Sequence, residues 1–406
     1  MLKGSRRCLS FMLEKEVGTA FEVPIGPQHP ALKEPILLLF KVDGDIVVDV
    51  WPRIHTHRGI EKATESRNYI QNIYLCERVC GICSFIHTLV YTQGVEKLLD
   101  IEAPPRAQYI RVIVSELERI HSHTLWLGVA AHELGFDTLF YYVWRDREVV
   151  MDLLELISGN RVNYAISTVG GVRRDISPEV ADKIRKGLDI LEKRMDVYKG
   201  VVEKEPTLRE RVVDVGKLSP QDAITLCAVG PTLRMTGVKR DVRADDPYQA
   251  YDEIPFNVIT YPTGDVLSQI IVRVGEVYEA INIIRYALDH MPSGPIKVKV
   301  PWYIPPNEVI SRGEAPRGEL FYYLKSNGTE KPERVKIRTP TLANIPSVCK
   351  MLIGCHVADI PIIFAGIDPC LSCTARFAFI DEKKNKSWIW NNEELRRYSL
   401  KWYGKA

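Results

Sequence analysis

The sequence predicts an α+β fold that is mostly helical, with a central bundle of long helices and β-rich segments at the N-terminus and the periphery. Three observations support this class. The first 55 residues are strand-like, residues 60 to 290 follow helical periodicity, and residues 295 to 345 combine prolines with short β-like runs. We found no internal repeat or obvious linker, so residues 1–406 are expected to form a single domain. Residues 1–20 are expected to be a flexible N-terminal extension.

The N-terminal region predicts a β-hairpin preceded by a loop. The runs "PILLLFKV" and "DIVVDVWP" flank Asp43-Gly44, which is a two-residue turn signal. Just before them, "PIGPQHPALKEP" at residues 24–35 contains four prolines and one glycine, which favours a fixed, irregular loop.

The central region predicts several long helices. Ser177-Pro178 is a cap residue followed by proline at the first helical position. Apolar residues then recur in steps of three and four, as expected for one helix face: Val180, Ile184, Leu188, Leu191, Met195, Tyr198 and Val202. A second long helix is expected from about Asp265 to Met291, and two more between residues 106 and 157. Residues 295–345 are expected to form an irregular excursion.

Charge and hydropathy exclude some classes of protein. The 54 basic and 52 acidic residues give a net charge of +2, so nothing indicates nucleic acid as the main partner. The longest apolar tract, residues 124–144, contains His132, Glu133 and Asp137, and therefore predicts a buried helical hairpin rather than a membrane span. The apolar stretch after Arg6-Arg7 is too short for an export signal.

Two cysteine pairs suggest a metal site. The chain has nine cysteines, and four of them form two C-x-x-C pairs, Cys80/Cys83 and Cys370/Cys373. Buried structural thiols and a structural zinc site are the alternatives, but paired zinc motifs usually lie roughly 15–20 residues apart. Two pairs from distant parts of the chain fit better with a catalytic metal at the centre of a large domain, and soft thiolates select nickel, copper(I), zinc or iron–sulfur. Polar residues flank both pairs: Arg78, His87, Asp368 and Arg376.

These motifs carry a family resemblance. "RVCGICSFIH" resembles the R-x-C-G-x-C-x-x-x-H signature of [NiFe]-hydrogenase large subunits, and "DPCLSCTAR" resembles their C-terminal signature. Further tracts resemble the membrane-bound, energy-converting (Ech-like) subgroup, which is related to the 49-kDa subunit of respiratory complex I: "GPQHPALKEP", "HRGIEK", "ERIHSH", "SGNRVNY", "GGVRRD" and "EAPRGE". The complex I relative lacks the cysteine ligands, whereas this chain has all four.

The resemblance implies a metal centre. Cys80 and Cys370 would be terminal nickel ligands, while Cys83 and Cys373 would bridge nickel to an iron that carries cyanide and carbon monoxide. Arg78, His87 and Asp368 would surround this cofactor. No further cysteine cluster suits an iron–sulfur centre in this chain.

It also implies roles in catalysis. Cys370 would accept the proton released from H2, Glu34 would relay it, and Arg317 would hold a fixed positive charge over the open coordination position. The residues alone also allow Glu34 to be a solvated loop charge, Arg317 a surface arginine and His87 an ordinary buried polar residue.

One feature departs from the resemblance. Arg376 stands where many hydrogenases have a histidine that helps to hold magnesium. Without that histidine, Glu61 is either a magnesium ligand or a structural residue, and the sequence argues against magnesium.

The expected function is the catalytic subunit of an energy-converting [NiFe] hydrogenase that interconverts H2 with protons and electrons. The resemblance implies a small [4Fe-4S] subunit, ferredoxin and antiporter-like ion-translocating membrane subunits as partners, on the cytoplasmic side of the cell membrane. Two alternatives stay open: a complex I-like or sulfur-reducing oxidoreductase subunit, and a non-catalytic scaffold with a structural zinc.

Overall fold

A computed structural model of the chain describes residues 20–30, 32, 34–54, 58–374, 379–381, 386–388, 392–402 and 404. Residues 1–19 of the expected N-terminal extension and Arg376 of the second cysteine motif lie outside these ranges.

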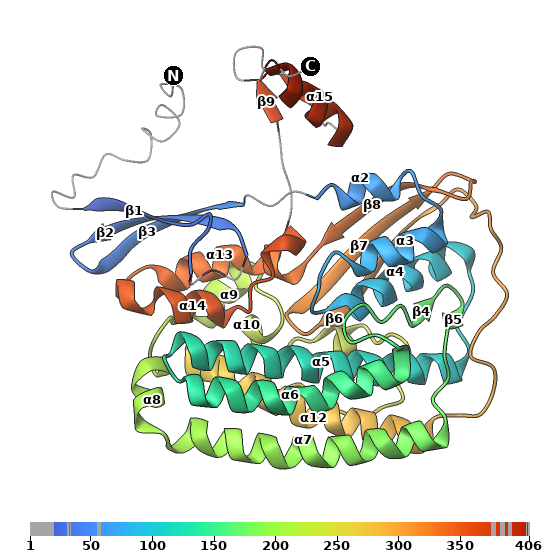
Figure 1. Ribbon diagram of the computed structural model, residues 1–406, viewed down its shortest axis with the longest axis horizontal. Helices are drawn as coiled ribbons and strands as arrows, with labels where there is room; N and C mark the ends of the chain where they lie inside the picture. The colour runs from blue at the N-terminus through green and yellow to red at the C-terminus, as the bar shows by residue number, and fades with distance from the viewer. Residues whose placement is uncertain are drawn as a thin grey trace.

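Four long helices form the centre of the molecule: α5 (Pro105–Glu133), α6 (Asp137–Ser158), α7 (Pro178–Lys204) and α12 (Val266–His290). They run side by side in Figure 1, where α5 and α7 each pack against both α6 and α12. This bundle confirms the predicted helices and the helical hairpin over residues 124–144. The hairpin is only partly buried, however, because Tyr141 and Tyr142 near the start of α6 are 68% and 51% exposed. The mostly helical α+β class is also confirmed.

Local sequence explains where these helices begin. The Ser177 side chain accepts a hydrogen bond from the Val180 amide at 3.4 Å, which caps α7. Asp265 and Ser268 form a reciprocal capping box at the start of α12. The predicted apolar face of α7 is buried from Ile184 to Val202, so the periodicity identified the core-facing side correctly.

An N-terminal antiparallel sheet lies above α13 and α14 at the left of Figure 1. Its strands are β1 (Phe21–Ile25), β2 (Ile36–Asp43) and β3 (Ile46–Ile54), and β3 packs against α13 (Pro340–Leu352). β2 and β3 form the predicted hairpin, whose turn contains Gly44 with a φ of 62°.

The expectation of an irregular excursion over residues 295–345 is wrong from residue 308 onward. Three strands form a regular antiparallel sheet, β6 (Glu308–Ala315), β7 (Gly318–Ser326) and β8 (Pro332–Arg338), which packs on α4 (Ser84–Leu99). In β7, Leu320, Tyr322 and Leu324 are buried while their neighbours are half-exposed. This period of two is a strand signal that the prolines obscured.

The remaining elements are short. In chain order they are α2 (Ile60–Thr64), α3 (Tyr69–Glu77), β4 (Ser167–Thr168), β5 (Gly171–Val172), α8 (Pro206–Val212), α9 (Pro220–Thr225), α10 (Pro231–Arg234), α11 (Val242–Asp245), η1 (Val357–Asp359), α14 (Ile360–Gly366), η2 (Leu371–Thr374), β9 (Phe379–Asp381), β10 (Lys386–Trp388) and α15 (Asn392–Trp402). Within the described ranges, every helix is too short or too polar to cross a lipid bilayer.

A buried ionic network joins the bundle to the β6–β7 turn. Arg234 pairs with Glu276 at 2.8 Å and with Glu314 at 2.7 Å, and all three side chains are buried. Arg119 of α5 donates to the Glu314 carbonyl at 2.8 Å. Buried charges need such partners to offset their desolvation. The network therefore fixes the turn in which Arg317 lies.

Candidate metal centre

The first cysteine loop lies between α3 and α4. Cys80 and Cys83 are both buried, and α4 begins directly after Cys83. The backbone amides of Ile82 and Cys83 point at the Cys80 sulfur, at 3.4 and 3.3 Å. Amides in this orientation stabilise a thiolate, so the turn is suited to present Cys80 in its anionic form.

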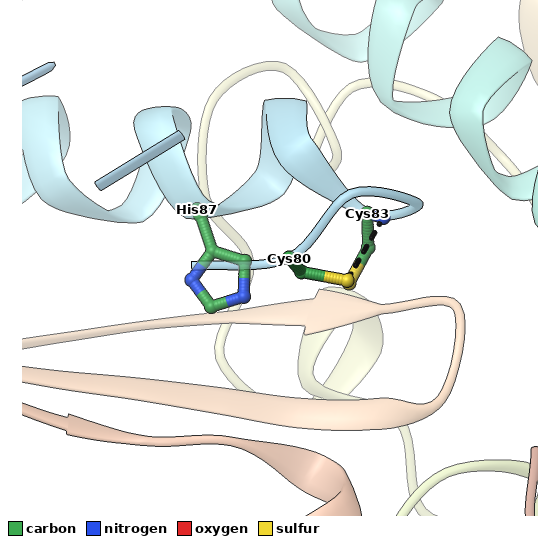
Figure 2. Close-up of side chains that lie close together, drawn as sticks. All are labelled: Cys80, Cys83 and His87. Atoms are coloured by element: carbon green, nitrogen blue, oxygen red, sulfur yellow. Dashed lines mark hydrogen bonds between the residues drawn. The ribbon is translucent and has the colours of Figure 1, made fainter. Parts of the chain in front are cut away.

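The second cysteine loop follows α14, includes the short helix η2 and meets the first loop. The Cys370 sulfur is 3.4 Å from the Cys80 sulfur, and Cys80 and Cys83 are 2.9 Å apart. Figure 2 shows Cys80 and Cys83 with His87 beside them. The Cys373 sulfur lies on the same second loop, 2.7 Å from the Cys370 carbonyl oxygen. The expected convergence is confirmed for Cys80, Cys83 and Cys370.

This donor set fits a thiolate-bound metal. Two sulfurs that share one metal, each with a bond near ~2.3 Å, are at most about 4.6 Å apart. The 2.9 and 3.4 Å separations satisfy that limit, and the described cysteines are free thiols. Hydrogen bonds from the Cys370 and Cys83 thiols hold the pKa of Cys80 well below its ordinary value. Cys80 therefore favours the thiolate, which is the form that binds a soft cation, whereas donation to neighbouring groups raises the pKa of Cys83 and of Cys370.

His87 faces the first loop from α4. Its ring lies with the thiols of Cys80 and Cys83 in a group whose ligand atoms are all within 4.8 Å of one another. Its Nδ1 is hydrogen-bonded to the Tyr322 hydroxyl at 2.8 Å. Burial lowers the pKa of His87 to about 4, so the ring is neutral at neutral pH. A neutral ring can hydrogen-bond a ligand sulfur, or it can itself bind a metal.

Arg317 and Asp368 form a buried pair beside the thiols. The Arg317 Nε donates to the Asp368 carbonyl at 2.6 Å, and its terminal nitrogen donates to Asp368 Oδ1 at 2.8 Å. Burial alone would lower the pKa of Arg317, but the Asp368 carboxylate and the cysteines raise it well above its ordinary value. Arg317 therefore supplies a fixed positive charge. The second carboxylate oxygen of Asp368 is buried and has no hydrogen-bond partner among the described residues.

Glu34 connects the second loop to an open cavity. Its carboxylate accepts a hydrogen bond from the Ser372 amide at 2.9 Å and another from the Ser372 hydroxyl. Glu34 also lines a cavity of about 500 Å³ with Gln28, His29 and neighbouring residues of the proline-rich loop. The carboxylate thus lies between a cysteine loop and a solvent-accessible space.

Arg78 and Glu61 lie further from the thiols. The Arg78 side chain is 58% exposed and donates to the Tyr74 carbonyl at 3.0 Å, one turn back in α3. Glu61 of α2 accepts from the Ile337 amide at 2.9 Å and pairs with the Lys336 ammonium at 3.2 Å. Lys336 thus supplies a positive charge at the Glu61 carboxylate, for which the alternative of a magnesium ligand was considered.

Two residues of the site were not identified from the sequence. Glu118 of α5 accepts hydrogen bonds from the Phe85 and Ile86 amides, at 2.6 and 3.0 Å, and so caps the first turn of α4. Arg58 donates to backbone carbonyls of both cysteine loops. Glu118 lies in "ERIHSH" and Arg58 lies in "HRGIEK", two tracts that carried the resemblance, but the sequence alone does not show which groups these side chains contact.

Comparison with protein families gives two matches. Residues 133–308 and 301–376 match the respiratory-chain NADH dehydrogenase 49-kDa subunit, and residues 58–130 match the nickel-dependent hydrogenases. The two matches together cover the helical bundle, both cysteine loops and the β6–β8 sheet.

Individual relatives are similar over most of the chain. The membrane-bound hydrogenase subunit alpha of Pyrococcus furiosus is 40% identical over 407 residues, which cover 95% of this chain and 94% of the relative. Formate hydrogenlyase subunit 5 of Escherichia coli is 39% identical over 380 residues, which cover 93% of this chain and 67% of the relative.

A solved structure has the same fold. It is the membrane-bound sulfane sulfur reductase, an archaeal respiratory membrane complex, in which a chain of 32% sequence identity superposes with a TM-score of 0.84. The match covers 89% of this chain and 100% of the other.

Proposed function

Because the chain belongs to the oxidoreductase family that includes the 49-kDa subunit of respiratory-chain NADH dehydrogenase and the membrane-bound nickel-dependent hydrogenases, we propose that it is the catalytic subunit of an energy-converting [NiFe] hydrogenase. Its reaction would be H2 ⇌ 2 H⁺ + 2 e⁻. One observation carries the proposal: the sulfurs of Cys80 and Cys370, which are 290 residues apart in the sequence, lie 3.4 Å apart with Cys83 beside them.

The four cysteines of the two pairs would hold the metals. A bound nickel–iron centre, with cyanide and carbon monoxide on iron, would supply the redox chemistry. The protein contributes burial, since Cys80, Cys83 and Cys370 are each at most 3% exposed. Burial excludes water and strengthens the electrostatic effect of nearby charges.

The neighbouring residues would handle charge and protons. Arg317, held by Asp368, keeps a positive charge beside the thiol cluster, where it can stabilise developing negative charge. Glu34 can receive a proton from the second loop and release it into the cavity of the proline-rich loop.

The partners follow from the same reasoning. A buried redox centre needs a nearby electron carrier, and we propose a small [4Fe-4S] subunit on the face of the proline-rich loop, with ferredoxin as donor or acceptor. The relatives are named as membrane-bound hydrogenase and respiratory membrane-complex subunits. Antiporter-like membrane subunits would hold this chain at the cytoplasmic side of the membrane.

Metal analysis of the purified complex tests the proposal. Nickel and iron in fixed ratio, infrared bands of cyanide and carbon monoxide, and H2/D⁺ exchange would support it. Zinc alone at Cys80, Cys83 and His87 would overturn it in favour of the structural scaffold.

A sulfur-reducing subunit is the second candidate. It is favoured by the structural likeness to the sulfane sulfur reductase at 32% identity. The same preparation should be assayed with one electron donor, once with polysulfide as acceptor and once without it, so that protons are the acceptor. Sulfide release without H2 evolution would establish the second candidate instead.

A further inference from the structure

Arg58 contacts both cysteine loops at once. Its guanidinium donates to the carbonyl oxygens of Arg78 at 2.7 Å and of Val79 at 2.5 Å, immediately before Cys80. It also donates to the Ser372 carbonyl at 2.7 Å, between Cys370 and Cys373. One side chain therefore joins two loops whose cysteines Cys80 and Cys370 are 290 residues apart in sequence.

The carbonyl, the amide and the hydroxyl of Ser372 each form a hydrogen bond. Its carbonyl accepts from Arg58, while its amide and hydroxyl both donate to Glu34. Glu34 immediately precedes the β2–β3 hairpin, and Arg58 follows it. The second loop is thus attached through its central residue to the two ends of one hairpin.

The geometry requires a guanidinium. Three carbonyls in two loops need several N–H donors in a fixed planar fork, which arginine supplies and the single ammonium of lysine does not. Arg58 touches carbonyl oxygens and no sulfur among these contacts, so it acts through the loops rather than on the reacting atoms.

We propose that Arg58 is a positioning residue that sets the spacing between the Cys80–Cys83 loop and the Cys370–Cys373 loop. The consequence for a nickel–iron centre rests on the proposed function, whereas the consequence for the loops themselves does not. Residues that orient metal ligands typically change metal affinity or activity by about 10–100-fold when they are removed.

The test uses Arg58→Lys and Arg58→Gln in the purified complex. Arg67→Lys is the matched control, because Arg67 is also exposed and its side-chain hydrogen bonds to the described residues stay within its own segment, at Ala63 and Ser66. Nickel retained after a chelator challenge should fall about 10-fold in Arg58→Gln and less in Arg58→Lys. The infrared bands of the diatomic ligands should shift or broaden more in Arg58→Gln than in Arg58→Lys, and the bands of the control should not change.

Hydrogen exchange on metal-free protein gives a readout that is independent of the cofactor. Peptides that cover residues 78–83 and 370–374 should both exchange about 10-fold faster in Arg58→Gln. A tenfold faster exchange means that local opening costs about 1.4 kcal/mol less, which is the contribution of about one hydrogen bond to each loop. Faster exchange in one loop only, uniform acceleration across the chain, or no difference from the control would overturn the proposal. If Arg58→Gln does not fold, the same criteria apply to Arg58→Lys. If the wild-type complex lacks nickel, the proposed function fails, and the exchange experiment still decides the role of Arg58.

Discussion

The sulfur atoms of Cys80 and Cys370 lie 3.4 Å apart, although 290 residues separate them in the chain. Neither loop buries its thiol alone. The first loop depends on Glu118, which caps the helix that follows it, and the second depends on Glu34 and Arg58. The thiol cluster is therefore a product of the whole domain.

Loss of one converging thiol should remove the metals. In Cys370→Ser, a hard hydroxyl replaces a soft thiolate donor, and nickel content should fall by at least about 10-fold with loss of H2/D⁺ exchange. Metal per chain is measured by mass spectrometry. Cys227→Ser, at an exposed cysteine, is the control and should keep its metals. Full nickel in Cys370→Ser would show that Cys370 is not a ligand.

Replacement of Glu34 should slow proton transfer and leave the metals in place. A glutamine can keep the contact with the Ser372 amide but cannot carry the proton, so H2/D⁺ exchange should fall about 100-fold. Metal content and infrared bands should match the wild type. Glu22→Gln, on exposed β1, serves as the control. Unchanged exchange in Glu34→Gln would place the proton route elsewhere.

Arg317→Lys should retain the positive charge but lose the paired contacts with Asp368. Lysine cannot reproduce the two donors that now reach the Asp368 carbonyl and carboxylate, so the charge is displaced. H2 oxidation should fall about 10²–10³-fold in kcat, as expected for the loss of a preorganised electrostatic contact. Steady-state kinetics measure this, with Arg312→Lys on the exposed edge of β6 as control. If Arg317→Lys and the wild type have equal kcat values, Arg317 contributes to packing and not to catalysis.

Glu118→Ala should destabilise the first cysteine loop. The Phe85 and Ile86 amides would lose their acceptor in a buried site, which costs about 1–3 kcal/mol for each unsatisfied group. Urea denaturation of the metal-free chain should show a free energy of unfolding lower by about 3 kcal/mol. The exposed Glu102→Ala variant should change it by less than about 0.5 kcal/mol. A similar small change in Glu118→Ala would mean that water replaces the cap.

The buried His123 should make stability depend on pH. Burial lowers the pKa of His123 to about 4, although its hydrogen bond to Glu276 opposes the shift. The unfolded value is near 6.5, so between these limits the unfolded chain binds the extra proton. The stabilisation is complete above about pH 6.5 and decreases as the pH falls toward 4, by about 2 kcal/mol at pH 5.

Urea denaturation of the metal-free chain at pH 7.5 and at pH 5 measures this effect. His123→Gln should lose less stability between the two pH values than the wild type does. His132→Gln, at an exposed histidine, should behave like the wild type. Identical pH dependence in all three proteins would show that His123 is accessible to protons in the folded chain.

The sequence by itself determined the features that depend on near neighbours in the chain. Helices α7 and α12 follow from cap residues and apolar spacing, the β2–β3 hairpin follows from its turn, and the two C-x-x-C pairs predict a soft-metal site. The resemblance extended these motifs to a fold, which the comparisons confirm. The ligand roles of the cysteines stay predictions.

Only the tertiary structure decided which distant groups meet. Arg58 and Glu118 are ordinary charged residues in the sequence, and their function depends on carbonyls and amides 20 to 314 residues away. The β6–β8 sheet was missed for a different reason: β7 carries a strand signal with a period of two, but the surrounding prolines obscured it, and only the pairing of the strands and their packing on α4 made the sheet evident. Backbone donors and acceptors carry no sequence signature, so contacts made through them are fixed by packing alone.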